Sequence, residues 1–154
     1  MLWQDVVIPI IRGLINDMGP TYTYADNRIE ELVLISSILM LNDIDFNTTY
    51  TINITSSTIT PDPSTDQDFV ALVALKTSCL ILNGEYKTAA DGAVSHRDAA
   101  SSLDATGVAN HKKILSEKAC GDYEKAKKSY IIGDGMLGRA IVSPYRVVDN
   151  TKFY

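Results

Sequence analysis

The stretch with the clearest chemical pattern is GDGMLG, which runs from Gly133 to Gly138. It fits G-x-G-x-x-G, the glycine pattern that lets a backbone approach a dinucleotide pyrophosphate. That chemistry needs a strand before the glycines and a helix after them, whose N-terminus faces the phosphates. Here a long predicted helix precedes the motif and an extended stretch follows it. We therefore predict that Gly133, Gly135 and Gly138 end the helix and form a hinge, and we expect no bound cofactor.

No other group of residues has the spacing of an active site or a metal site. His96 and His111 are the two histidines, and neither has a cysteine or carboxylate at ligand spacing. The triplet His96-Arg97-Asp98 matches part of a kinase catalytic loop, but the glycine loop, lysine strand and Asp-Phe-Gly are missing. Asp43 and Asp45 lack the glycine and closing glutamate of a calcium loop. The sequence predicts no catalytic residue, no metal site and no enzyme.

Composition and charge restrict the class of protein further. The chain has 154 residues, 45% of them hydrophobic, which suits one domain with a packed core. A net charge of −5 argues against a general nucleic-acid binder. Residues 1–75 hold two basic and ten acidic side chains, whereas residues 76–154 hold twelve basic and nine acidic ones. This division is either incidental to a solvated surface or the mark of complementary surfaces that meet between neighbouring copies.

Cysteine usage and hydropathy bear on the compartment. Cys79 and Cys120 lie in apolar, helix-like stretches without metal spacing, so we expect free buried thiols and a reducing compartment. The N-terminal stretch has no basic region of the kind that opens a signal peptide. Uninterrupted apolar runs stay well below the ~18–20 residues that a membrane span needs, so we expect no membrane association.

Helical periodicity dominates the first part of the chain. Residues 2–18 predict a helix that Pro9 kinks or delays to about Asp5, and that Gly19-Pro20 ends. A second helix is expected to open at Thr23, with its hydroxyl capping the first turn and Asp26 three residues on. This second helix is apolar on nearly every face, which predicts burial all round, partly against a neighbouring subunit.

The remaining elements alternate between strand, helix and loop signals. Alternating residues predict a β-hairpin at about 48–60, and a third helix begins at Ser64 or Thr65 and extends to about Ala90. Residues 91–106 are small and polar and predict a loop or arm. A fourth, lysine-rich helix is expected from about Val108 to Tyr130.

These elements define the expected architecture. The fold class is mainly α: a small helical bundle of about four helices with a short β-hairpin and an extended C-terminal tail. Residues 1–132 form the helical domain, and residues 133–154 form the glycine hinge and the tail. The tail is β-branched and aromatic and is interrupted by Pro144, which favours an extended conformation that lies on another surface.

In the order of its segments the chain resembles the head-completion or head–tail adaptor proteins of tailed bacteriophages. The resemblance rests on stretches that together cover most of residues 2–130: the capped acidic helix opening at 22–32, the strand at 50–54, Asp68-Phe69 with Leu72, Leu75-Lys76 and Cys79, the loop ending at 101–104, and the helix that carries Tyr123.

The resemblance implies a structural role in the virion neck, after assembly in the host cytoplasm. Such proteins form a ring, often of twelve copies, that binds the phage portal protein, extends the DNA channel without specific DNA binding, and offers a docking surface to a tail or nozzle protein. It also implies that the C-terminal tail grips the portal, with the candidate contacts Arg139, Ile141, Tyr145, Arg146 and Phe153. The alternatives are another neck, tail-completion or assembly factor, and a small cytoplasmic enzyme without a visible motif.

Overall fold

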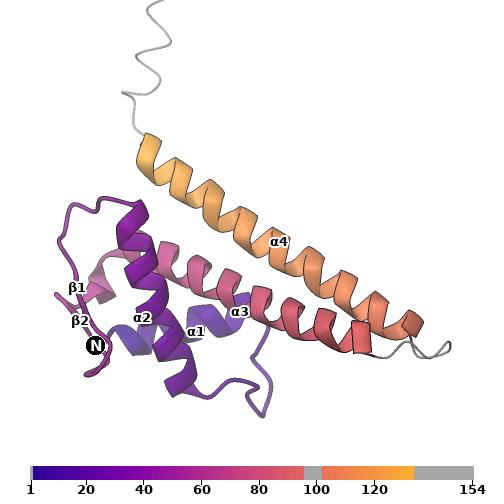
Figure 1. The fold of residues 1–154 in the computed structure, drawn as a ribbon. Helices are drawn as coiled ribbons and strands as arrows, with labels where there is room; N and C mark the ends of the chain where they lie inside the picture. The colour runs from indigo at the N-terminus through magenta and orange to yellow at the C-terminus, as the bar shows by residue number, and fades with distance from the viewer. Residues whose placement is uncertain (1, 96–101, 134–154) are drawn as a thin grey trace, which may run out of the picture.

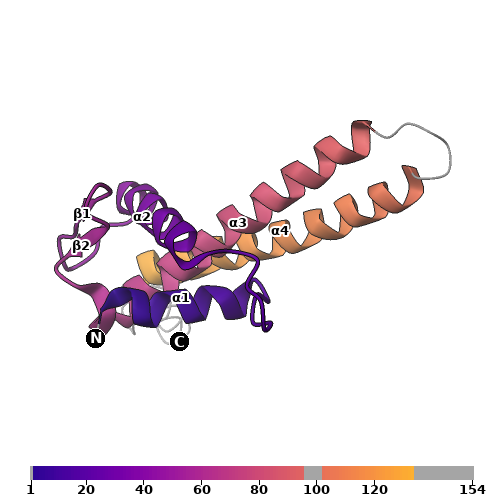
Figure 2. The same ribbon diagram turned by 90° about the horizontal axis from the view of Figure 1, so that it is seen from below.

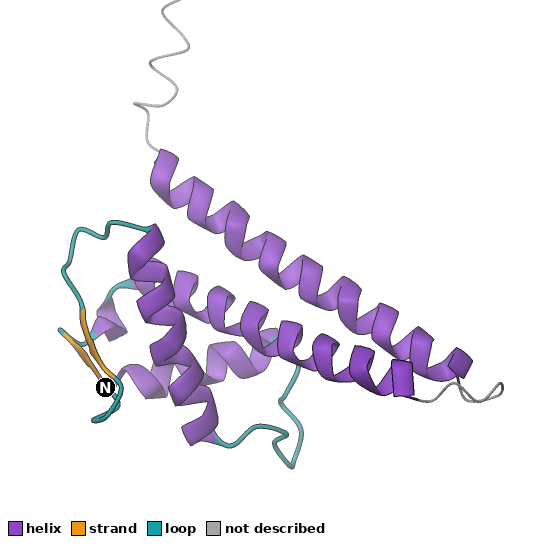
Figure 3. Cartoon of the chain, viewed as in Figure 1, coloured by secondary structure: helices purple, strands orange, loops and turns teal. Residues whose placement is uncertain are grey.

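The computed structural model describes residues 2–95 and 102–133 of the chain. Within these ranges it contains four α-helices, one two-stranded antiparallel hairpin and one 3₁₀ turn (Figures 1 and 3). The elements are α1 (Trp3–Leu14), α2 (Asp26–Asp43), β1 (Thr51–Asn53), β2 (Thr58–Thr60), η1 (Pro63–Thr65), α3 (Gln67–Ser95) and α4 (Ser102–Ile132). The predicted fold class, a mainly helical bundle with a short hairpin, is confirmed. The predicted tail lies outside the described residues.

The long helices α3 and α4 run antiparallel and form the spine of the molecule (Figure 1). Helices α1 and α2 both pack on the first half of α3 and also contact each other (Figure 2). The β-hairpin lies at this same end, with Ile52 opposite Ile59. The far ends of α3 and α4 project beyond the body, so this part of the pair packs chiefly on itself (Figures 1 and 2).

One hydrophobic core joins every helix and the hairpin in the described part of the chain. Each helix contributes side chains that are almost fully buried, and burying one such side chain is worth roughly 1.5–3 kcal/mol. The main contributors are Trp3, Val7, Ile11, Ile29, Val33, Leu34, Met40, Ile59, Phe69, Val73 and Tyr123.

Helix α1 begins within one residue of the predicted start, but it ends well before the predicted end. It begins at Trp3, whose N–H donates to Asp62, and it continues through Pro9, which is exposed, so that water can reach the freed carbonyl group of the preceding turn. It ends at Leu14 rather than at Gly19-Pro20. The predicted end was wrong because the N–H of Asp17 turns back to the carbonyl oxygen of Arg12 at 2.9 Å.

Helix α2 begins at Asp26, so the predicted start at Thr23 was wrong. The N–H of Thr23 donates to a carboxylate oxygen of Asp17 at 2.8 Å, which holds this residue in the preceding loop. Ala25 occupies the capping position, without a side-chain hydrogen bond. The expected burial on all sides is not reached within one chain, because Ile35 and Leu39 are 41% and 42% exposed.

Helix α3 starts beside Asp66, whose carboxylate accepts the N–H of Phe69 at 3.1 Å and the hydroxyl of Tyr50 at 2.6 Å. This arrangement ties the hairpin to the first turn of the helix. The helix then passes Gly84 without ending. Its segment Gln67–Gly92 is long and apolar enough to cross a membrane by length and composition alone, but half of the tested window is buried inside the bundle, as is usual for a core helix.

The loop or arm predicted at 91–106 is wrong over most of its length. Helix α3 extends to Ser95 and α4 already begins at Ser102. The small polar residues in this region include several alanines, which favour helix. A single glycine inside a helix lowers its stability by only about 1 kcal/mol. Packing of the two helices along each other outweighs that cost.

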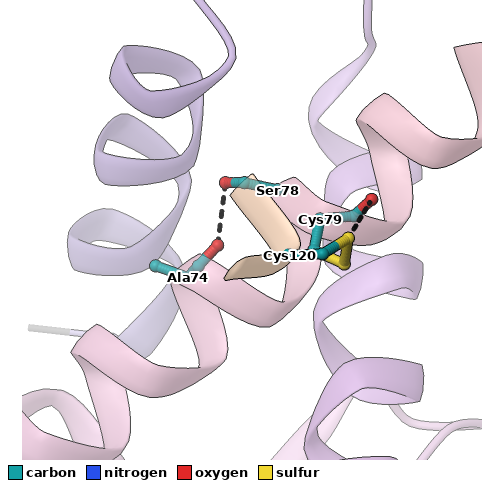
Figure 4. The surroundings of a disulfide bond; sticks show 4 residues. All are labelled: Ala74, Ser78, Cys79 and Cys120. Atoms are coloured by element: carbon teal, nitrogen blue, oxygen red, sulfur yellow. Dashed lines mark hydrogen bonds between the residues drawn. A yellow bond between two sulfur atoms is a disulfide. The ribbon is translucent and has the colours of Figure 1, made fainter. Parts of the chain in front are cut away.

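A disulfide joins Cys79 of α3 to Cys120 of α4, with the two Cα atoms 4.7 Å apart (Figure 4). The expectation of free thiols was therefore wrong, and the inference of a reducing compartment loses its basis. The antiparallel helices bring residues 41 positions apart to the same height. The dashed line from Cys120 Sγ to the carbonyl oxygen of Cys79 marks a 3.8 Å contact, because a disulfide sulfur has no proton to donate.

Candidate functional site at the end of helix α4

The structure describes one of the sequence-predicted site residues, Gly133. The other proposed hinge glycines, Gly135 and Gly138, lie outside the described residues. So do the proposed tail contacts, which are Arg139, Ile141, Tyr145, Arg146 and Phe153. The candidate site is therefore the surface of the helical bundle around Gly133.

Gly133 is the first residue after α4, and its backbone has a φ of 67°. Its N–H donates to the carbonyl oxygen of Tyr130 at 3.3 Å. A positive φ suits glycine because a Cβ would be strained there, which is why glycine so often follows a helix end. Helix α4 therefore ends next to a glycine in the left-handed backbone conformation.

Tyr130 lies one turn before this point and lines two surface hollows. The hollows have volumes of about 480 Å³ and 450 Å³, and we call their combined lining the exit surface. It consists of Asp43, Asp45, Asn47, Asp68, Ala71, Leu72, Ala126, Ser129, Tyr130, Ile131 and Gly133.

An aromatic cluster supports the exit surface from below. The ring of Tyr130 lies 5.1 Å from that of Phe46, and Phe46 lies 5.3 Å from Phe69 and 6.2 Å from Tyr50. Such tilted and edge-to-face ring pairs stabilise the fold beyond what the burial of their apolar area contributes. They fix the position of the Tyr130 side chain, because its ring packs against a core that extends into α3 and the segment before the hairpin.

The exit surface is acidic. Asp43, Asp45 and Asp68 belong to its lining, while the described basic side chain beside it, Lys127, lies 3.0 Å from Asp43. The hydrogen bond to Asp43 raises the pKa of Lys127. Burial, with the nearby charges of Asp66 and Asp68, raises the pKa of Tyr130, so this hydroxyl is neutral at physiological pH.

The tyrosine next to the exit surface keeps its hydroxyl proton at neutral pH. The pKa of Tyr50 is raised to about 12 by burial and by its hydrogen bond to Asp66, well above the range useful to a general base. In the described ranges 2–95 and 102–133, no three histidine, cysteine or acidic side chains gather as they would around a metal ion. An acidic rim over an aromatic floor suits a peptide with basic and apolar side chains.

A second cluster of polar residues surrounds the buried Arg12, which sequence reasoning missed. Its guanidinium group lies 2.7 Å from Asp17, hydrogen-bonds Asp26 and the carbonyl oxygen of Tyr24, and stacks on the ring of Tyr22 at 3.7 Å. This cluster fastens the end of α1 to the start of α2. Arginine inside a helical stretch gives no sequence signal for it, since lone charges usually lie on solvated faces.

The residues that the sequence analysis considered for chemistry are not assembled into a site by the described structure. His111 is exposed on α4, and Asp43 and Asp45 belong to the exit surface. His96, Arg97 and Asp98 lie outside the described residues.

Comparison of the chain with protein-family models, with curated proteins and with solved structures finds no match.

Proposed function

We propose that this protein is a structural adaptor of the neck of a tailed bacteriophage. Copies of the helical body form a ring beneath the portal, and the C-terminal segment of each copy binds the portal protein. The body extends the DNA channel, and its net negative charge limits sticking of the phosphate backbone during transit. A tail or nozzle protein docks on the other side of the ring.

The observation that carries the proposal is the exposed apolar end of α4 next to Gly133. The described core joins α1 to α4, and Gly133, the first residue after α4, is exposed. Ile131 and Ile132, just before it, are 57% and 72% exposed, so two adjacent apolar side chains stand uncovered beside the start of the proposed tail. Residues 139–154 then supply aromatic anchors such as Tyr145 and Phe153 for a partner.

The test is deletion of residues 139–154, followed by a binding assay with the portal ring. The truncated chain is expected to keep its far-UV circular dichroism and its unfolding midpoint, because the core lies within the body. It is expected to lose portal binding. The control is Leu2→Ala, which alters an exposed apolar side chain at the N-terminus and should leave binding unchanged. Full portal binding by the truncated chain would refute the proposal.

An independent test uses a lysate of the source. After sedimentation, mass spectrometry should find the chain with DNA-filled particles, at a copy number near that of the portal. A chain that stays entirely with the soluble proteins contradicts the neck assignment and reopens the search for an enzymatic or an assembly role.

A further inference from the structure

The exit surface combines two hollows with an apolar floor. The hollows, of about 480 Å³ and 450 Å³, share the half-buried Tyr130. Leu72 and Ala126 also line the first hollow, and Ile131, which is 57% exposed, lines the second. A concave surface with an exposed apolar floor is suited to the apolar and aromatic side chains of a bound peptide segment.

The exit surface also carries acidic charge that the described chain does not compensate. Asp43 is matched by Lys127 at 3.0 Å, so this pair adds no net charge. Asp45 and Asp68 are exposed, and in the described part of the chain neither has an ion-pair or hydrogen-bond partner. Lys128, near the end of α4, lines neither hollow. A bound segment with two basic side chains would therefore form ion pairs here without breaking existing ones.

The C-terminal segment, residues 139–154, is tethered next to these hollows. Gly133, from which the chain continues towards this segment, itself lines the first hollow. Five residues separate Gly133 from Arg139, so Arg139 lies within about 22 Å of Gly133 in any conformation. A tether this short gives an effective concentration on the order of millimolar, so that even a weak contact within one chain is populated.

The amino-acid sequence of this segment matches the exit surface in charge and in side-chain type. Residues 139–154 hold three basic side chains, Arg139, Arg146 and Lys152, against one acidic side chain, Asp149. They also hold three aromatic side chains, at positions 145, 153 and 154. A segment that is both basic and aromatic is what a hollow with an apolar floor and two unpaired carboxylates would select.

We propose that the exit surface binds residues 139–154 of its own chain, with Arg139 and Arg146 paired to Asp45 and Asp68. The tether favours the same chain over a second copy, because millimolar effective concentration exceeds the concentration of free chains in a dilute solution. The contact lies beyond the proposed function, since it forms in an isolated chain without a portal. A portal protein that binds the same segment would have to compete with the exit surface for it.

Hydrogen exchange of the full chain, followed by mass spectrometry, tests this contact. Backbone amides in residues 139–154 should exchange about tenfold or more slowly than those of a free peptide with the same sequence. The double variant Asp45→Asn, Asp68→Asn should lower this protection by about threefold or more, because two ion pairs are lost. The control Glu117→Gln, Glu124→Gln removes the same charge from exposed positions of α4 outside the exit surface and should keep the protection.

The decisive comparison reverses the charges on both sides. The variant Asp45→Arg, Asp68→Arg should release the segment, and the further changes Arg139→Asp and Arg146→Asp should restore most of the protection. Far-UV circular dichroism checks that each variant folds. If the arginine variant does not fold, Arg139→Asp, Arg146→Asp in the otherwise unchanged chain replaces it, and this variant should also lose the protection.

Three results overturn the proposal: wild-type amides in residues 139–154 that exchange as fast as the free peptide, an Asn double variant that keeps full protection, or reversed charges that restore none. Sedimentation velocity gives the oligomeric state of each sample. Protection that appears only at concentrations where the chain self-associates assigns the segment to a neighbouring copy and also overturns the contact within one chain.

These outcomes are separate from those of the portal assay. If residues 139–154 exchange freely in the isolated chain while their deletion abolishes portal binding, the adaptor function stands and this contact falls. If reversed charges restore the protection while the truncated chain still binds the portal, the contact stands and the adaptor function falls.

Discussion

At the scale of single residues, the clearest contrast is between two buried tyrosines. The hydroxyl of Tyr50 donates to Asp66 at 2.6 Å, whereas that of Tyr123 is buried without a hydrogen-bond partner among the described residues. An unmade hydrogen bond leaves a desolvation cost uncompensated. Tyr123→Phe is therefore expected to keep or raise the free energy of unfolding, by up to about 1 kcal/mol, and Tyr50→Phe to lower it by about 1 kcal/mol. Urea unfolding of both variants checks this, and the reverse order would contradict it.

The lowered pKa of Asp17 predicts that the stability of the fold depends on pH. The N–H of Thr23 lowers its pKa most, burial opposes this, and the N–H of Tyr24 and the charge of Arg12 lower it further. A lowered folded-state pKa contributes stability above the ordinary value of 3.8, and that contribution is lost as the pH falls through the folded-state value. We expect Asp17→Asn to unfold at a lower temperature than the wild type at pH 7. The difference should shrink below about pH 3.8.

The control for this series is Asp45→Asn, which changes an exposed carboxylate. Thermal unfolding of all three chains between pH 7 and pH 2.5 provides the comparison. A constant difference between Asp17→Asn and the wild type across that range would show that Asp17 stabilises the fold for a reason other than its charge.

At the scale of the elements, the disulfide has the most direct consequence. Cross-linking residues separated by 41 positions restricts the unfolded chain, and a loop of this length corresponds to about 4 kcal/mol in the chain-entropy model. The oxidised protein should show no reactive thiol, since the sequence contains two cysteines and both are paired. Reductant should lower its unfolding midpoint. A Cys79→Ala, Cys120→Ala double variant should unfold at a lower temperature with or without reductant.

The elements also show what the sequence predicts and where it stops. The spacing of the apolar residues predicted the helices, and the alternation of apolar and polar residues around Ile52 predicted the hairpin. The ends depended on contacts from elsewhere: Asp17 holds Thr23 in a loop, and the N–H of Asp17 turns back to Arg12 after the end of α1. The pairing of Cys79 with Cys120 depends on the register of two antiparallel helices, which neither stretch encodes by itself.

The candidate site was less predictable than the fold. The glycine motif located the end of α4, and Gly133 does follow it with a positive φ. The exit surface, however, collects residues from three separate stretches, around Asp43, Asp68 and Tyr130. No local pattern links carboxylates that meet only after the bundle has formed, so they could not be found before the structure was known. The hinge and the tail contacts remain predictions.

At the scale of the whole molecule, the shared core predicts cooperative unfolding. Trp3, the one tryptophan of the chain, is 3% exposed and packs in the same core as Phe69 of α3 and Tyr123 of α4. Its fluorescence should therefore change at the same urea concentration as the far-UV circular dichroism, which reports mainly on the long helices. Separate midpoints would mean that α1 leaves the bundle before α3 and α4 come apart.

The bond between Cys79 and Cys120 has a mechanical meaning as well. If tension acts on the chain from beyond Gly133, it reaches α4 at its last turn and tends to peel the helix from the core towards its start. Tyr130, Ala126 and Tyr123 would be pulled away in that order, but at Cys120 the force passes through a covalent link into α3. A pull on the C-terminus would then be shared by two helices, and unzipping would stop after about three turns.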